Sequence, residues 1–280
     1  MPLVKSRDGV RVHYEVHDFT DPWATRPVLL LQHGFGRSSR YWYSMVPHLA
    51  RHFKVVCPTM RGFGESDSDF DLEHGLNLEN CLADLTAIIE DLGVPSVHFA
   101  GESMGGMLGM ALAALHPQRV RTLSLMTAPL FIREEVQQTF GFGCGSWAEA
   151  MEKLGVYEWA KKANSATRFP PGTNPELIDW YARETGKNKL ASMLALVKFA
   201  SSANVSSLID RIRCPALGLY PAASAVATDE QQEAIRNGIR GIRIVHLPTS
   251  FHMVWVLYPG VCARHVSHFV AAHEGIACVE

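Results

Sequence analysis

The chain has 280 residues, of which 47% are hydrophobic and 19% charged, so it can bury a substantial core as one domain with an insertion. The formal net charge of −2 gives no electrostatic reason to expect nucleic acid or an anionic membrane as a partner. Residues 1–16 contain no apolar signal-peptide core, and no apolar run approaches ~20 residues. We therefore expect a soluble protein that binds neither nucleic acid nor membranes.

The cysteines are scattered, without a CxxC pair or a metal-like spacing: Cys57, Cys81, Cys144, Cys214, Cys262 and Cys278. Most lie in apolar runs, which favours buried free thiols and a reducing compartment, so we expect a cytoplasmic protein. The chain has no HExxH motif, no paired carboxylate cluster and no glycine-rich phosphate loop. We therefore predict no metal and no cofactor.

Strands and helices alternate along most of the chain. In chain order, strands are predicted at residues 11–17, 28–32, 53–58, 96–100, 121–126, 216–220 and 242–247. Helices are predicted between them at residues 77–92 and 104–116, and at the end at residues 261–273. This alternation is typical of a mostly parallel central sheet flanked by helices on both faces.

The pattern changes between residues 129 and 210, where helical periodicity dominates. Helices are predicted there at residues 146–154, 157–163, 175–184 and 189–200, with a break at Pro170-Pro171-Gly172. We interpret residues 129–210 as a helical lid inserted into a core formed by residues 1–128 and 211–280. Loops at the carboxyl edge of an open α/β sheet are where such folds place their sites. The alternative is a second packing layer without function.

A short motif lies between a predicted strand and a predicted helix. Gly101-Glu102-Ser103-Met104-Gly105 fits the G-x-S-x-G nucleophile elbow, in which a sharp turn projects a serine hydroxyl above the sheet. Residues 96–100 read as the buried strand running into it, and residues 104–116 as the helix running out. Strand, elbow and helix together are the context that the motif requires.

Three further segments accompany the elbow in a fixed order. They are His33-Gly34-Phe35-Gly36, Arg61-Gly62-Phe63-Gly64-Glu65-Ser66 and the late segment at residues 247–253, which contains His252. With these segments the chain resembles the α/β-hydrolase-fold serine hydrolases over nearly its whole length outside the lid. The resemblance implies the α/β-hydrolase fold and a serine nucleophile. We expect His33 and Arg61 to be structural.

Ser103 is the candidate nucleophile, and it needs a base because a serine hydroxyl attacks poorly on its own. Among the 13 histidines, His252 alone lies in the loop after the last strand, where the resemblance places the base. The tetrahedral intermediate also needs donors for its oxyanion. The backbone N–H of Met104 is one, and the resemblance implies the N–H of Phe35 as the second.

The third member of a triad is missing from its usual places. The family's acid position falls on Ser224, and the alternative position falls on Thr127. Three interpretations remain open. A displaced carboxylate could orient His252, the candidates being Asp229, Glu230, Glu134 and Glu135. Ser224, a water or a backbone carbonyl could orient it instead, or the protein could be a catalytically weak binding module. Retention of the elbow, the His-Gly turn and His252 argues against the last interpretation.

The lid sequence bears on the substrate. It is rich in apolar bulk, and residues 147–168 resemble the lid of enol-lactonase-like members of the family. Phe35, Trp42, Met104 and Met107 could add an apolar acyl pocket near the elbow. We therefore expect a carboxylesterase or lactonase acting on a small to medium, largely apolar substrate. The alternatives are a carbon–carbon bond hydrolase with the same Ser-His pair and a ligand-binding member of the fold. A homo-oligomer is compatible with this sequence.

Overall fold

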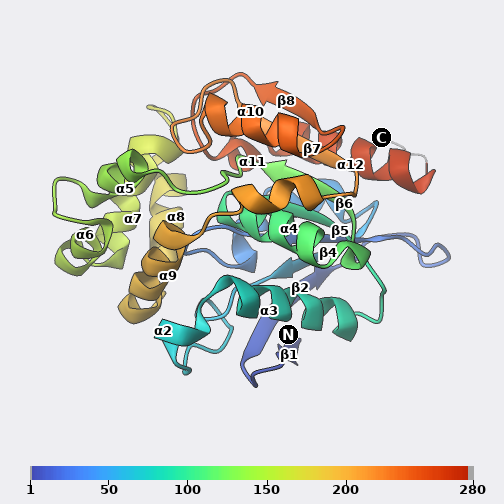
Figure 1. Cartoon of the computed structure of the whole chain (residues 1–280), viewed down its shortest axis with the longest axis horizontal. Helices are drawn as coiled ribbons and strands as arrows, with labels where there is room; N and C mark the ends of the chain where they lie inside the picture. Colours follow the sequence, from blue (N-terminus) through green and yellow to red (C-terminus); the bar gives the residue numbers. More distant parts are fainter. Residues whose placement is uncertain (1, 277–280) are drawn as a thin grey trace.

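The computed structural model describes residues 2–276, which contain an eight-stranded sheet at the centre of the molecule (Figure 1). Its strands are β1 (Leu3–Lys5), β2 (Arg11–His17), β3 (Val28–Gln32), β4 (Lys54–Pro58), β5 (Val97–Glu102), β6 (Val120–Met126), β7 (Ala216–Pro221) and β8 (Arg243–Leu247). They lie in the order β1-β2-β4-β3-β5-β6-β7-β8. The pairings of β2 with β1 and β4 are antiparallel, and the remaining pairings are parallel. The mostly parallel sheet expected from the sequence is confirmed.

Both faces of the sheet are covered, which explains the continuous apolar run of β3. All of its residues are buried. Because successive side chains of a strand point to opposite faces, β3 contributes to two separate cores. Leu30 packs in the core of one face, and Leu29 and Leu31 pack in the core of the other.

Flanking helices supply the other half of each core. One face carries α3 (Leu78–Asp91), α4 (Met104–Leu115) and α10 (Asp229–Gly238), and the other carries α1 (Val46–Leu49), α11 (Val254–Leu257) and α12 (Pro259–Glu274). The short helix α2 (Leu72–Gly75) precedes α3, and 3-10 turns occupy Ser39–Trp42, Pro117–Arg119 and Ser206–Arg211. The helix α3 begins where the Asn77 side chain accepts the Asn80 N–H at 2.9 Å, because this bond satisfies an amide that has no partner inside the helix.

The helical insertion (residues 129–210) connects β6 to β7. Its helices are α5 (Glu134–Gly141), α6 (Trp147–Leu154), α7 (Val156–Ala163), α8 (Pro175–Gly186) and α9 (Leu190–Ser202), and a π-helical turn follows α7 at Asn164–Arg168. Figure 1 shows these helices gathered, in green to yellow, at one side of the sheet. That side is reached from the carboxyl end of β6. The insertion therefore lies where the sequence predicts a lid.

The expected elements agree with the structure to within a few residues, and the differences have local causes. Strand β5 continues through Gly101 to Glu102, two residues beyond the predicted end, because it stays paired with β6 up to Met126. The break at Pro170-Pro171-Gly172 does separate two helical stretches. The edge strand β1 and the helices α1, α2, α5, α10 and α11 were not predicted, since each is either very short or polar on most of its surface.

The remaining sequence-based expectations concern thiols and membranes. The five cysteines within the described residues are free, and Cys57, Cys81 and Cys262 are buried. Cys278 lies outside the described residues. Among residues 2–276, none of the helices combines the length and the apolar character that crossing a membrane would require.

Candidate active site

Ser103 stands between β5 and α4 in a backbone conformation that side chains rarely adopt. Its φ is 51° and its ψ is −121°, and a positive φ strains a residue that carries a Cβ. The Ser103 N–H donates to Met126 O at 2.9 Å, and the Ser103 carbonyl accepts from Gly106 N and Met107 N at 2.9 and 3.2 Å. Hydrogen bonds to β6 and α4 therefore hold the strained turn in place.

The two glycines of the motif let neighbouring backbones come together at this turn. A Cβ at Gly101 would lie 2.4 Å from Gly105 O, and a Cβ at Gly105 would lie 2.2 Å from Gln32 O. Both positions are too close for any side chain. The helix α4 consequently packs directly against β5 and the end of β3, and Ser103 faces a cavity instead of the core.

His252 lies in the loop between β8 and α11, and the helical insertion holds that loop. The His252 N–H donates to Thr167 O at 3.1 Å, and the Met253 N–H donates to Arg168 O at 3.3 Å. The ring is buried. Burial, with Arg37 and Arg168 nearby, lowers the pKa of His252 well below its usual value. The ring is therefore neutral at pH 7.

The turn after β3 is held by His33. The Met60 N–H donates to His33 Nε2 at 2.9 Å, so the ring proton is on Nδ1, which donates to Gly34 O at 2.8 Å. Burial lowers the pKa of His33 to about 4, which suits a neutral structural ring. Within residues 2–276, the amides of Phe35 and Met104 donate to no other protein group, and both residues line the cavity.

A buried ion pair joins the elbow to this turn. Glu102 Oε1 accepts from the Gly34 N–H and from Arg37 Nη1, and the Glu102 and Arg37 side chains are only 1% and 3% exposed. Arg37 Nη2 also contacts Met253 Sδ at 3.2 Å, and the guanidinium carbon lies 5.1 Å from the centre of the Trp255 ring. Glu102 thus fixes the spacing between the strand that carries Ser103 and the turn that carries Phe35.

Arg168 ends the π-helical turn of the insertion and reaches the same cavity. Its guanidinium carbon lies 5.7 Å from the Phe140 ring centre and 5.5 Å from the Trp159 ring centre, distances typical of cation–π contacts. Its Nη1 donates to Asn164 Oδ1 at 3.1 Å. Burial, with the charge of Arg37, lowers the pKa of Arg168 to about 9. Within residues 2–276 no carboxylate lies within ion-pair distance of Arg168.

These groups meet in one small cavity. It is lined by Phe35, Arg37, Ser103, Met104, Ile132, Phe140, Trp147, Thr167, Arg168, Ala200, Val226 and His252. Its empty volume is about 460 Å³, of which a water-sized sphere can occupy about 30 Å³. Across the described residues, the Ser103 hydroxyl and the His252 ring share this cavity without a hydrogen bond between them. The cavity is therefore closed to anything much larger than water.

Comparison with known proteins agrees with this architecture. A family model described as the alpha/beta hydrolase fold matches residues 27–150. The crystal structure of the enol-lactonase from Burkholderia xenovorans LB400 superposes with a TM-score of 0.84 at 22% identity, covering 96% of this chain and 100% of that chain. The chain has the α/β-hydrolase fold.

Two curated relatives show how far the sequence similarity extends. The protein from Agrobacterium fabrum that is named as the carbamate hydrolase RutD is 33% identical over 117 residues. That match covers 42% of this chain and 43% of RutD, so it spans less than half of each protein. A rice protein (Oryza sativa subsp. japonica), whose name calls it an esterase, is 24% identical over 253 residues, or 88% of this chain and 93% of that relative.

The Arg61 segment has the structural role expected for it. Arg61 is fully buried and pairs with Asp84 at 2.5 Å and with Asp8 at 2.6 Å. Its Nη1 also donates to Gly75 O at 3.2 Å. These bonds tie the turn after β4 to α3 and to the chain near β2. Arg61 does not line the cavity.

Neither of the usual acid positions contacts the predicted base. The Nδ1 atom of His252 is enclosed and, within residues 2–276, has no hydrogen-bond partner. The Ser224 hydroxyl accepts the Ala227 N–H at 2.9 Å. The Thr127 hydroxyl is buried and also has no hydrogen-bond partner in the described chain. The backbone of Thr127 has a positive φ of 49°, which strains a β-branched residue. Direct orientation of the ring by Ser224 is therefore wrong.

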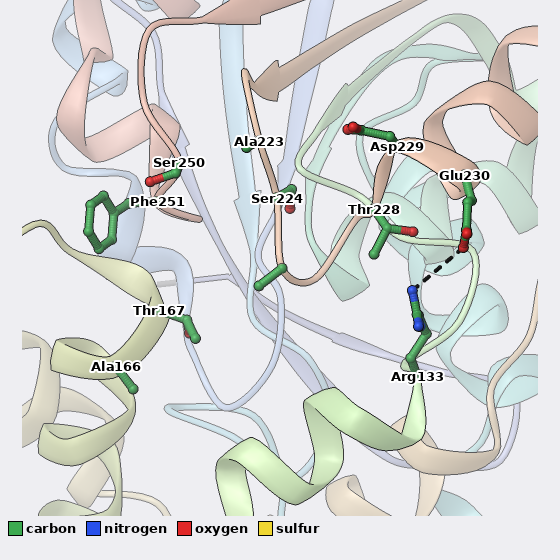
Figure 2. Close-up of a pocket in the computed structure, with 11 residues that line it drawn as sticks. Arg133, Ala166, Thr167, Ala223, Ser224, Thr228, Asp229, Glu230, Ser250 and Phe251 are labelled. Carbon is green, nitrogen blue, oxygen red and sulfur yellow. Dashed lines mark ion pairs between the residues drawn. The ribbon is translucent and has the colours of Figure 1, made fainter.

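The four carboxylates considered as replacements do not contact the predicted base either. Figure 2 shows Asp229 and Glu230 beside a neighbouring pocket with an empty volume of about 980 Å³, and Glu230 pairs with Arg133 at 3.5 Å. Glu134 and Glu135 begin α5, and Glu135 pairs with the same arginine at 3.1 Å. The interpretation of a displaced carboxylate is therefore wrong for these four residues, because within residues 2–276 the Nδ1 atom of His252 has no hydrogen-bond partner.

The expected acyl pocket is only partly correct. Phe35, Met104 and Trp147 line the cavity. Trp42 is buried instead in the core on the far face of the sheet, and Met107 is buried in the core beneath α4. Both positions follow a strand or an elbow closely in sequence, but their side chains point into the packed layers.

Two residues that line the cavity were not predicted from the sequence. The cavity was expected to be largely apolar, but Arg37 and Arg168 make part of its wall cationic. The available signal for Arg37 was its position directly after the His-Gly turn, and the signal for Arg168 was a basic residue ending an apolar helical face. Within the part of the chain that the structure describes, no three metal-ligating side chains are grouped as in a metal site.

Proposed function

We propose that this α/β hydrolase cleaves a carboxylic ester or lactone through an acyl-enzyme at Ser103, with His252 as general base. The observation that carries the proposal is the strained serine of the strand-to-helix turn, which shares one enclosed cavity with a buried neutral imidazole. A neutral imidazole is the form that can accept the hydroxyl proton. The names of the similar proteins, a carbamate hydrolase, an esterase and an enol-lactonase, agree with attack on an acyl carbon.

Acylation forms one bond and breaks another. The Ser103 oxygen attacks the carbonyl carbon while His252 Nε2 takes the hydroxyl proton. The resulting oxyanion accepts hydrogen bonds from the N–H groups of Phe35 and Met104, and the start of α4 favours its negative charge. The carbon–oxygen bond to the leaving group then breaks, and His252 returns the proton to that oxygen. In a lactone, the leaving hydroxyl remains part of the acyl group.

Deacylation repeats these steps with water. His252 removes a proton from water, and the hydroxide oxygen attacks the acyl carbon. The bond to Ser103 then breaks, the serine oxygen takes the proton back, and a carboxylic acid is released. The imidazolium therefore forms twice in each turnover. The two arginines beside His252 oppose it both times.

Substrate entry requires the cavity to enlarge. The volume open to a water-sized sphere is about 30 Å³, whereas small-molecule sites usually hold about 300–1,000 Å³. Half of the cavity wall comes from the helical insertion, namely Ile132, Phe140, Trp147, Thr167, Arg168 and Ala200. We propose that the insertion acts as a lid and moves away from the sheet to admit the substrate. The neighbouring pocket shares Thr167 with the cavity.

The test separates the nucleophile from the reaction. A fluorophosphonate probe should attach to wild type at Ser103, as found by mass spectrometry of the peptide, and should not attach to Ser103→Ala. Turnover of p-nitrophenyl butyrate should fall by about 10³-fold or more in both Ser103→Ala and His252→Ala. The exposed residue His268 provides the control, because His268→Ala should retain wild-type turnover. Equal turnover in all four proteins would sink the hydrolase proposal.

A second candidate function is supported by one observation. Because His252 Nδ1 has no partner in the described chain, the site could bind a ligand and turn it over only weakly. Probe attachment without ester turnover would favour this candidate. Turnover of a vinylogous diketone, but not of esters, would favour the carbon–carbon hydrolase instead.

A further inference from the structure

Arg168 brings an unpaired positive charge into the catalytic cavity, and this inference rests on the function proposed above. The residue is only 6% exposed. A guanidinium carries five N–H donors. Within residues 2–276 the Arg168 side chain donates one hydrogen bond, from Nη1 to Asn164 Oδ1. Buried charges are normally paired, because desolvation of an isolated ion is expensive. Arg168 therefore lacks a partner that its burial calls for.

The other buried arginines show that this chain does supply partners elsewhere. Arg37 pairs with Glu102, and Arg61 pairs with both Asp84 and Asp8. Arg168 differs from Arg61 because it lines the cavity, and it differs from Arg37, which lines the same cavity, because within residues 2–276 it has no carboxylate partner. Its guanidinium is held beside two aromatic rings, which fix the group without neutralising it.

We propose that the missing partner is a carboxylate of the substrate: Arg168 binds a carboxylate carried by the ester or lactone, and this group places beside His252 a negative charge that the chain does not supply there. A planar guanidinium matches a carboxylate with two parallel hydrogen bonds. A single arginine in a narrow cavity suits one carboxylate better than a phosphate monoester, which carries up to two charges.

The carboxylate would also change the chemistry at the base. The charged groups facing His252 are Arg37 and Arg168, and Glu102 balances the first of them. An uncompensated Arg168 disfavours the imidazolium that forms in each step, which is the species that a triad acid normally stabilises. Neutralising Arg168 removes that opposition, so the pKa of His252 rises when an anionic substrate binds. A carboxylate should therefore raise kcat as well as lower KM.

The first experiment measures binding without turnover. Calorimetry on the full chain carrying Ser103→Ala compares adipate with adipamide, its uncharged counterpart. Adipate should bind at least about tenfold more tightly than adipamide, and Arg168→Gln should abolish that difference. Arg133→Gln is the matched control, because this arginine lines the neighbouring pocket and already has two carboxylate partners. It should leave the difference intact.

The second experiment measures selectivity. Wild type should hydrolyse 4-nitrophenyl hydrogen adipate with a kcat/KM about 10²-fold above that of p-nitrophenyl butyrate, and Arg168→Gln should remove the preference. Arg168→Lys keeps the charge but loses the planar fork, so it should retain part of the preference. The acidic limb of the kcat–pH profile should lie at higher pH for the anionic ester in wild type, and at the same pH for both esters in Arg168→Gln.

The outcomes separate the two proposals. Equal binding of adipate and adipamide, or equal kcat/KM for the two esters with the acidic limbs coinciding, would overturn the role of Arg168 while leaving ester hydrolysis intact. Adipate binding that depends on Arg168, in a protein that turns over neither ester, would support the anion site and refute the hydrolase. If Arg168→Gln fails to fold, Arg168→Lys and the adipate–adipamide comparison still decide the question.

Discussion

The buried pair of Glu102 and Arg37 should be a principal support of the site, and Glu102→Gln tests it. Both side chains are almost completely buried, and Glu102 Oε1 also accepts the Gly34 N–H. Removing one partner leaves the other charge buried and unpaired, which typically lowers the free energy of unfolding by about 3–5 kcal/mol. At about 2 °C per kcal/mol for a chain of this size, Tm should fall by about 6–10 °C.

A double-mutant cycle gives the decisive measurement. The free energy of unfolding is measured in urea for Glu102→Gln, for Arg37→Met and for the double variant. The double variant should lose less stability than the sum of the two single losses, because it leaves no unpaired charge. The control is Glu90→Gln, which removes an exposed partner of Arg119 and should change stability by less than about 1 kcal/mol. A loss below about 1 kcal/mol in Glu102→Gln, or strict additivity, would refute the reasoning.

Two further predictions concern the elbow helix and acid stability. A Cβ at Gly105 would lie 2.2 Å from Gln32 O, so Gly105→Ala should cost about 3 kcal/mol in urea unfolding. At Gly260 the nearest atom is 3.6 Å away, so that alanine should change stability by less than about 1 kcal/mol, and equal effects would contradict the packing argument. Because the pKa of His33 falls from 6.5 to about 4 on folding, the unfolded state binds more protons, and about 3 kcal/mol of stability should be lost as the pH falls from 6.5 to 4. Urea titrations across that range should show this loss unchanged in His268→Gln, because His268 is an exposed histidine on α12.

The sheet could be predicted because its signals are local. The continuous apolar run of β3 is what a strand buried on both faces requires, and the small-residue helix α4 follows from the glycines that must pass close to β5. The helix α5 was missed for the converse reason. Its sequence has little apolar bulk, and it is stabilised by Phe140 packing on Trp147, a contact made only in the folded insertion.

The candidate site also contains residues that local sequence predicts and residues that it does not. Ser103 could be found because the turn that strains it is encoded within five residues, and His252 because chain order places it after the last strand. The two arginines that line the cavity could not be predicted from the sequence. Whether an arginine reaches solvent or a cavity depends on which elements cover it. Arg37 lies against Met253, and Arg168 shares a cavity with Ser103, so both surroundings come from segments far away in sequence.

The charged groups beside His252 are set by the tertiary fold and not by distance in the sequence. Sequence distance made Asp229 and Glu230 candidates, but both begin α10, where they lie beside a surface pocket and near the positive end of a helix dipole. Meanwhile Thr127 keeps a strained turn at the end of β6 with a hydroxyl in place of a carboxylate. Within residues 2–276 two arginines line the cavity, and of the two only Arg37 has a carboxylate partner, Glu102. In the proposed mechanism the imidazolium of His252 forms beside these arginines, and a negative group that enters with the substrate would balance the charge.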